Sequence, residues 1–291
     1  MKIVSKPMWT SAARMGIGES PIWDEDRRTL YWVDVTAPAI YALHDGQVST
    51  IPLQKPVGSI FLGRPGTLLV ALRHGLRRLD LRTGELATLE VPCPMGSDER
   101  FNDGRCDRDG RLWISTMDRQ LNRPLGSVVC IEDSRSRSWF STQARVGNGI
   151  AFSHDDRKLY FSDTSGRAIY EYDKAQALSA SGSLPRKLFA ELDSTPGRPD
   201  GCTIDAEGCL WSARVAGGRI DRYAPDGRLV DWFELPVSHP THCTFGGDQF
   251  RTLFVTTANH SAEGHEGPLN GCTLAYELGI QGRAEHRCLS H

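Results

Sequence analysis

One position that recurs six times along the chain carries side chains able to hold a metal ion. It lies ten to twelve residues before a repeated leucine and is occupied by Glu19, Val57, Asn102, Asn148, Asp200 and Thr241. Two carboxylates and two carboxamides among them make an all-oxygen donor set that suits Ca²⁺, Mg²⁺ or Mn²⁺, with zinc and iron as alternatives. A single Asp or Asn before a strand would be assigned to a turn, especially where glycine follows. Four oxygen donors at equivalent positions favour a metal site.

The elements that position these residues are repeats of about 40 to 50 residues. In each repeat, a turn precedes a leucine followed by aromatic or β-branched residues, and the leucines are Leu30, Leu68, Leu112, Leu159, Leu210 and Leu253. Each leucine lies in a strand-like segment of its own. One further short segment precedes that strand and two follow it, which makes four strands per repeat. The pattern predicts an all-β fold, a six-bladed β-propeller with four antiparallel strands per blade, as a single domain over residues 1–291.

Two segments have competing interpretations. Residues 6–13 are expected to supply the outer strand of the last blade, although residues 283–289 compete for that place. Residues 174–182 have the composition of a helical turn or of a solvated loop, and we expect the loop.

Composition limits the classes of function. The 291 residues include 39% hydrophobic and 24% charged residues with a net charge of −2, which gives no electrostatic reason to expect a nucleic-acid partner. No apolar run is long enough for a signal peptide or a membrane span, so a cytoplasmic protein is expected, and its oligomeric state stays open. Eight cysteines lack zinc-type spacing and are expected to be buried thiols, and the histidines also lack the spacing of a zinc site.

Five motifs resemble those of a known family. They are GESPIW around Glu19, RFNDG from Arg100, GRLWISTM from Gly110, GNGIAFS from Gly147 and RPDGCTID from Arg198. In this order they resemble the regucalcin (senescence marker protein)/gluconolactonase family of sugar lactonases. The resemblance implies a six-bladed propeller in which Glu19, Asn148 and Asp200 hold one divalent cation and Arg100 and Asn102 bind substrate. Members similar to regucalcin carry a substrate-contacting glutamate where this chain has Gln120, so substrate identity does not follow from the resemblance.

The activity expected from this resemblance is metal-dependent hydrolysis of sugar lactones, whether aldono-, urono- or aldarolactones, to the corresponding acids. The cation, with calcium, magnesium, manganese or zinc as candidates, would polarise the carbonyl and stabilise the oxyanion. Asp200 is the candidate general base, and a hydroxide on the cation is the alternative. A metal-dependent aryl-ester or organophosphate hydrolase and a non-catalytic interaction scaffold are the rival functions.

A second column, two residues earlier in each repeat, bears on the substrate. It contains Ile17, Lys55, Arg100, Val146, Arg198 and His239. Three are cationic and a fourth, His239, can become so, which leads us to expect a preference for lactones that carry a free carboxylate; the loss of an acidic contact at Gln120 agrees with it. The alternative is that Lys55 and Arg198, each beside a proline, are solvated loop residues.

Other conspicuous residues have plainer interpretations. Asp34 and Asp163 end equivalent strands and could support the site or form turns, with neither favoured. The recurring tryptophans Trp23, Trp32, Trp113 and Trp211 are expected to pack between blades.

Overall fold

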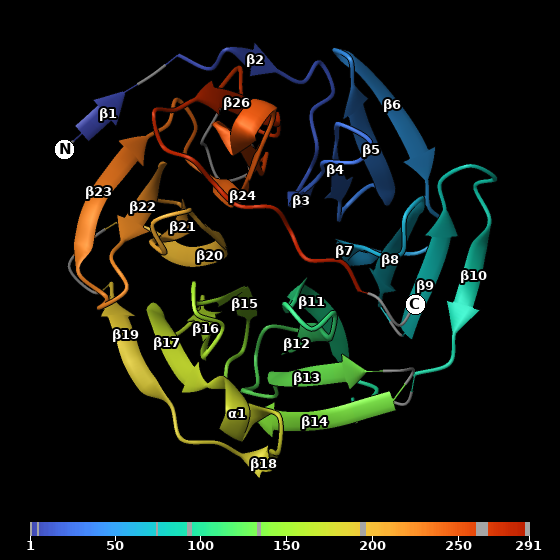
Figure 1. Cartoon of the computed structure of the whole chain (residues 1–291), viewed down its shortest axis with the longest axis vertical. Coiled ribbons are helices and arrows are strands. Elements are labelled where there is room, and N and C mark those ends of the chain that lie inside the picture. Colours follow the sequence, from blue (N-terminus) through green and yellow to red (C-terminus); the bar gives the residue numbers. More distant parts are fainter. Residues whose placement is uncertain are drawn as a thin grey trace. The chain divides into compact units, whose positions relative to one another are not determined.

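The chain is a six-bladed β-propeller, as the repeats predict (Figure 1). The computed structural model describes residues 2–4, 6–73, 75–91, 95–132, 135–192, 196–259 and 267–288. The strands form six antiparallel four-stranded sheets, two of which gain a fifth, parallel strand. Two compact units each contain three of the sheets; the first spans Met1–Pro56 and Leu192–Ala284, and the second spans Val57–Glu191 and Glu285–His291.

The first unit contains the first, fifth and sixth sheets. The first sheet consists of β3 (Gly18–Asp24), β4 (Thr29–Asp34), β5 (Ala39–His44) and β6 (Gln47–Pro52). The fifth consists of β20 (Arg198–Ile204), β21 (Leu210–Val215), β22 (Arg219–Tyr223), β23 (Leu229–Glu234) and β1 (Lys2–Val4). The sixth consists of β24 (Pro240–Gly246), β25 (Thr252–Thr257), β26 (Leu274–Glu277) and β2 (Trp9–Thr10), with the 3₁₀ turn η1 (Asp248–Phe250). β24 packs against both β3 and β20.

The second unit contains the other three sheets. The second sheet consists of β7 (Val57–Leu62), β8 (Thr67–Leu72), β9 (Gly75–Asp80) and β10 (Leu86–Leu89). The third consists of β11 (Glu99–Cys106), β12 (Leu112–Asp118), β13 (Ser127–Glu132), β14 (Arg135–Ser141) and β18 (Ser181–Ser183). The fourth consists of β15 (Gly147–Phe152), β16 (Lys158–Asp163), β17 (Ala168–Asp173) and β19 (Lys187–Glu191). β11 packs against both β7 and β15.

The outer strand of the sixth sheet comes from the N-terminal segment, because Trp9 and Thr10 pair with Ala275 and Leu274. Residues 283–288 form no strand, so the competing assignment of 283–289 is wrong for its described part. The expectation of a loop at 174–182 is also wrong in part, because Lys174–Ala177 forms the helical turn α1 and Ser181–Ser183 forms β18. The Asp173 carboxylate caps α1 by accepting from the Gln176 N–H at 2.8 Å.

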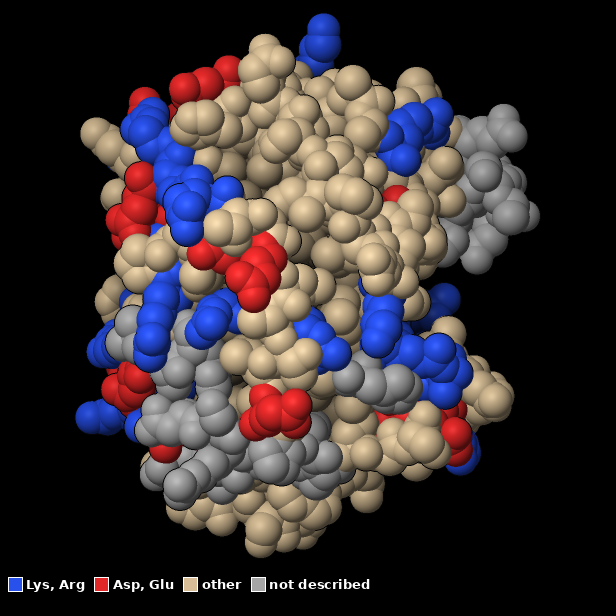
Figure 2. Space-filling model, turned by 90° about the vertical axis from the view of Figure 1, so that its right-hand side faces the viewer, with Lys and Arg blue, Asp and Glu red and all other residues tan. Residues whose placement is uncertain are grey.

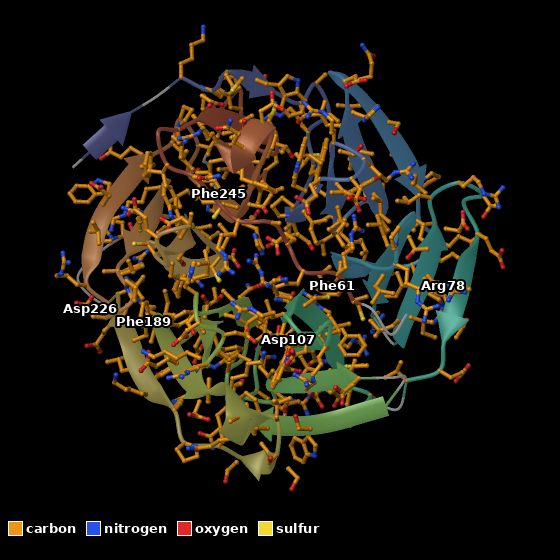
Figure 3. The ribbon with its side chains drawn as sticks, viewed as in Figure 1. Phe61, Arg78, Asp107, Phe189, Asp226 and Phe245 are labelled. Atoms are coloured by element: carbon orange, nitrogen blue, oxygen red, sulfur yellow. The ribbon has the colours of Figure 1, made fainter. Side chains whose placement is uncertain are left out.

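The cores lie between neighbouring sheets of each unit. All four recurring tryptophans are buried there, as expected, with Trp113, Trp211 and Trp32 fully inaccessible. Phe61 and Phe245, labelled in Figure 3, are each 1% exposed and belong to the cores of the second and first units. The seven cysteines in the described ranges are buried thiols, and Cys93 lies outside those ranges. No helix of the described chain is long and apolar enough to cross a membrane. On the face drawn in Figure 2, acidic and basic side chains are interspersed.

A buried ionic cluster joins the third and fourth sheets. The Asp107 carboxylate, which is inaccessible to solvent, accepts from Trp113 Nε1 at 3.0 Å and from the Arg111 N–H at 2.9 Å, and lies 3.0 Å from Lys174 Nζ. Burial alone would raise the pKa of Asp107, but these hydrogen bonds and the Lys174 charge outweigh it and lower that pKa. Lys174 is itself buried, which explains why α1 is helical rather than a solvated loop.

We expect Asp107→Ala to lower the free energy of unfolding by about 2–4 kcal/mol at pH 7, because it removes one of the two carboxylates that pair with the buried Lys174, the other being Asp156 at 2.5 Å, and also the acceptor of Trp113 Nε1. The control is Asp226→Ala, which removes an exposed turn carboxylate bonded to the Arg228 N–H and should cost below about 1 kcal/mol (both residues are labelled in Figure 3). Since the pKa of Asp107 is lowered by folding, its stabilisation is present above about pH 4 and is lost as the pH falls through the lowered pKa. Urea titrations at pH 7 and in acid measure both effects. Equal losses in the two variants would contradict the prediction.

Candidate active site

In every sheet, the first strand of the predicted blade (β3, β7, β11, β15, β20 or β24) is irregular at the position where the metal ligands are predicted. Pairing with the second strand shifts register between Glu19 and Ile22, Val57 and Ser59, Phe101 and Gly104, Asn148 and Ala151, Pro199 and Cys202, and Pro240 and His242. Each residue of the predicted column borders or lies within one of these bulges. A bulge re-aims side chains that would otherwise alternate between the faces of a sheet. The repeated bulge is therefore the local structure beneath the sequence column.

Two bulges need unusual backbone at the residue after the predicted ligand. Ser20, which follows Glu19, and Gly149, which follows Asn148, both have φ of 50°. This conformation disfavours residues with a side chain, and a serine there is uncommon. The Ser20 N–H in turn donates to Glu19 Oε2 at 3.1 Å. The bulge thus orients the Glu19 carboxylate as well as the strand.

In the second unit the structure joins three of the predicted residues by hydrogen bonds. Arg100 Nη1 donates to Asn102 Oδ1 at 2.9 Å, Asn102 Nδ2 donates to Asn148 Oδ1 at 3.0 Å, and Asn148 Nδ2 donates to Thr164 Oγ1 at 3.3 Å. Asn148 is 5% exposed, while Arg100 and Asn102 are half-buried. The side chains that the sequence assigned to substrate binding and to metal binding therefore form one polar chain here.

Further hydrogen bonds hold the strands beneath this chain. The Ser115 hydroxyl, inaccessible on β12, lies 2.9 Å from both the Asp103 and the Gly147 carbonyl oxygens. Asn102 Nδ2 also donates to the Gly147 carbonyl at 2.9 Å. The bulges of β11 and β15 are thereby fixed relative to one another, which limits the movement of Asn102 and Asn148.

In the first unit, Glu19 lies on β3 and Asp200 on β20. Asp200 is 6% exposed and Glu19 is half-buried. Gly201, the residue after Asp200, lies so close to His242 that a Cβ there would be 2.0 Å from its ring. Only glycine fits this approach, which brings β24 directly beside the bulge that carries Asp200.

His242 is a neighbour of the site that the sequence did not single out. It is 3% exposed, and its Nδ1 lies 3.0 Å from the Cys243 carbonyl oxygen, which makes Nδ1 the protonated nitrogen. No metal-ligand spacing marks it in the sequence. Gly201 is the sequence feature that could have pointed to a close neighbour here, because its missing side chain leaves room for the His242 ring.

Gln120 is exposed in the turn after β12. Asp118 at the end of β12 anchors this turn by accepting from the Asn122 and Arg123 N–H groups at 2.9 and 2.8 Å. The equivalent aspartates do the same. Asp34 accepts from the Gly16 and Thr36 N–H groups at 3.0 and 2.9 Å, and Asp163 accepts from that of Gly166 at 2.8 Å. Of the two roles left open for Asp34 and Asp163, turn formation is the one observed.

The cationic column is only partly accessible. Lys55 and Arg198 are exposed, whereas His239 is 3% exposed with its Nδ1 2.9 Å from Ser238 Oγ. His239 therefore drops out of the group expected to attract anions. The described residues contain no cluster of three or more His, Cys, Asp and Glu side chains suited to a metal ion, and the proposed donor set has only two such members.

Comparison with known proteins adds three findings. Residues 17–259 match the family model described as SMP-30/Gluconolactonase/LRE-like region. The chain is 37% identical to a 6-deoxy-6-sulfogluconolactonase of Pseudomonas putida, over 92% of this chain and 94% of that one, and 30% identical to pentonolactonase XacC of Haloferax volcanii, over 93% and 94%. A solved structure of the calcium-binding protein regucalcin from Agrobacterium tumefaciens aligns with a TM-score of 0.89 at 26% identity, over 100% of this chain and 99% of that one.

Proposed function

Because this chain belongs to the SMP-30/gluconolactonase/LRE-like family, we propose that it is a metal-dependent hydrolase that opens sugar lactones to the corresponding acids. The observation that carries the proposal is the repeated bulge, at which four of the six first strands carry a carboxylate or carboxamide side chain. Two relatives named as lactonases support the reaction class.

We assign Glu19, Asn148 and Asp200 as the protein ligands of one divalent cation, with calcium, magnesium, manganese and zinc as candidates. The donors are all oxygens, as hard cations require. Asn148 Oδ1 accepts a hydrogen bond from Asn102, and a carboxamide oxygen has two lone pairs, so this atom type can accept such a bond and coordinate a cation at the same time. When bound, the cation would polarise the lactone carbonyl and stabilise the negative charge that develops on its oxygen.

The remaining steps belong to the side chains of this protein. Asp200 accepts a proton from the attacking water. In the proposed set only the carboxylates of Asp200 and Glu19 can act as a general base, and we assign this role to Asp200. Arg100 and Asn102 bind the hydroxyl groups of the sugar and orient the ring, and their hydrogen bond to one another restricts the rotamers of both. Gln120 contacts the substrate as an uncharged donor or acceptor in place of a glutamate.

The function is tested by comparing turnover of gluconolactone, a phosphotriester and an aryl ester by the purified protein. We expect gluconolactone or another sugar lactone to be hydrolysed with a kcat/KM at least about 10²-fold above that of the other two classes. Faster turnover of the phosphotriester or the aryl ester would instead identify the rival hydrolase. Absence of turnover with all three classes and a panel of sugar lactones would favour an interaction scaffold.

We further propose that the preferred lactones carry an anionic group. Lys55 and Arg198 are exposed cations two residues before the column, and Arg100 is a third cation at the equivalent position. Gln120 lacks the charge that would repel an anion. The name of the Pseudomonas putida relative specifies a gluconolactone with a sulfonate group, which is an anion. Carboxylate-bearing and sulfonate-bearing lactones are therefore both candidate substrates.

Arg198→Ala and Lys55→Ala should each lower kcat/KM for glucarolactone or a 6-sulfonated gluconolactone by about tenfold, since a charge-assisted hydrogen bond is worth about 1.5 kcal/mol. The effect on neutral gluconolactone should stay within about twofold. Arg228→Ala, which removes another exposed cation of the first unit, is the matched control. Raising the ionic strength should reduce the preference because salt screens exposed charges. A preference of the unmodified protein for neutral lactones would reject this part of the proposal and leave the lactonase activity standing.

A further inference from the structure

The segment that follows β26 belongs to no sheet, yet it is firmly attached at two places. Within the first unit, the Gly282 N–H donates to the Phe250 carbonyl at 2.8 Å, and the Gln281 carbonyl accepts from the Ala206 N–H at 2.9 Å. Gly282 lies so close to Phe245 that a Cβ there would be 2.0 Å from its side chain. The segment is therefore packed on the fifth and sixth sheets, where no bulkier residue fits at position 282.

Within the second unit, the end of the same segment docks beside β7 and β11 (Figure 1). The Cys288 N–H donates to the Leu62 carbonyl at 2.8 Å, and Arg287 Nη1 donates to that of Gly63 at 3.4 Å. Glu285 Oε1 lies 3.4 Å from Arg105 Nη1, with both side chains largely buried. We call residues 285–288 the C-terminal strap. It is held by a backbone hydrogen bond, by an ion pair and by the burial of side chains.

The strap brings the thiol of Cys288 to the thiol of Cys106. Cys106, the last residue of β11, is 3% exposed, and Cys288 is inaccessible. Both belong to one core cluster with Phe61 and Leu112, and their side chains share a hydrogen bond. Two buried thiols that share a hydrogen bond, one on β11 and the other on the strap, are a candidate pair for a disulfide.

We propose that Cys106 and Cys288 form a redox-modification site, at which a disulfide fastens the C-terminal strap to β11. With oxidised glutathione as the oxidant, the Cys288 thiolate attacks one of its sulfurs and releases one glutathione. The Cys106 thiolate then attacks the Cys288 sulfur of the mixed disulfide and releases the second. Two protein thiols are oxidised, one glutathione disulfide is reduced to two thiols, and each protein thiol gives up one proton.

The contacts also predict how the site is controlled. The hydrogen bond with Cys288 and then burial raise the pKa of Cys106, and Cys288 is inaccessible to solvent, so neither thiol reacts while the strap is docked. Reaction requires the strap to detach, and a segment that belongs to no sheet opens more readily than core strands. The rate of oxidation should therefore rise with pH and with low concentrations of urea that leave the sheets folded.

The experiment uses the full chain, incubated with oxidised glutathione at pH 8 and then digested without reduction. We expect a peptide that links Cys106 to Cys288 in mass spectra, and a melting temperature about 5–10 °C above that of the same sample after dithiothreitol, because the disulfide closes a long loop. Cys288→Ser should lose both the peptide and the shift, whereas Cys130→Ser, which alters another buried thiol, should keep both.

Three outcomes would overturn the proposal. They are no linked peptide under conditions that consume the thiols, mixed glutathione adducts alone, or a link that forms only after the protein is unfolded. The wild-type protein is compared with itself before and after reduction, so a substitution that impairs folding does not affect this measurement.

Discussion

Removal of divalent metal should lower lactone hydrolysis by about 10³-fold or more, since loss of the polarising cation removes several kcal/mol of transition-state stabilisation. The test is the initial rate with the best lactone after exhaustive chelation, with the residual metal content measured by mass spectrometry. Adding back calcium, magnesium, manganese or zinc separately should restore activity, and the order of restoration identifies the effective ion.

Chelation needs a control for damage to the fold. The melting temperature of the metal-free protein should show that the sheets remain folded, because the described cores consist of apolar side chains packed between sheets and include none of the proposed metal ligands. Full activity in a sample shown to be free of metal would reject the proposed mechanism. Loss of activity together with global unfolding would assign the metal a structural role instead.

Asp200→Asn should lower kcat by about 10²-fold or more at saturating metal, because a carboxamide is too weak a base to take the proton from water. The comparison is Glu19→Gln, which weakens the other carboxylate ligand without removing the proposed base. Activity of Glu19→Gln should recover as the metal concentration rises, whereas that of Asp200→Asn should not. Asp226→Asn, at an exposed turn, controls for the change in net charge.

Full recovery of Asp200→Asn at high metal concentration would limit Asp200 to a ligand and make another source of base necessary. Calorimetric titration of metal into the two variants separates the roles directly, since a loss of affinity alone shifts the binding curve and leaves kcat unchanged at saturation.

Much of this site could be predicted from the chain alone, because each blade repeats the same local pattern of turn, strand and strand. The residues ten to twelve positions before the repeated leucines all lie at the bulges of the first strands. Equivalent sequence positions adopt equivalent backbone wherever the same short-range hydrogen bonds and side-chain alternation recur. The oxygen-donor column could therefore be recognised in the sequence before the bulges at these positions were known.

Contacts between distant parts of the chain were not visible in this way. The α1 turn depends on Lys174, whose buried ammonium group lies 3.0 Å from Asp107, 67 positions earlier in the sequence. The hydrogen bonds that join Arg100, Asn102 and Asn148 likewise depend on the packing of β11 beside β15. The packing of His242 on Gly201 is of the same kind.

The sequence by itself determined the number of blades, most of their strands and the residues of the oxygen-donor column, since these follow from side-chain period and turn chemistry within one repeat. Only the tertiary structure decided between the two candidates for the outer strand of the sixth blade. Both have strand-like local patterns, so local preference cannot separate them. Trp9 and Thr10 pair with β26, whereas Cys288 is buried in the same cluster as Cys106 and its N–H donates to the Leu62 carbonyl. The energies of burial and of strand pairing depend on which distant residues pack beside a segment, and the sequence of that segment alone does not specify them.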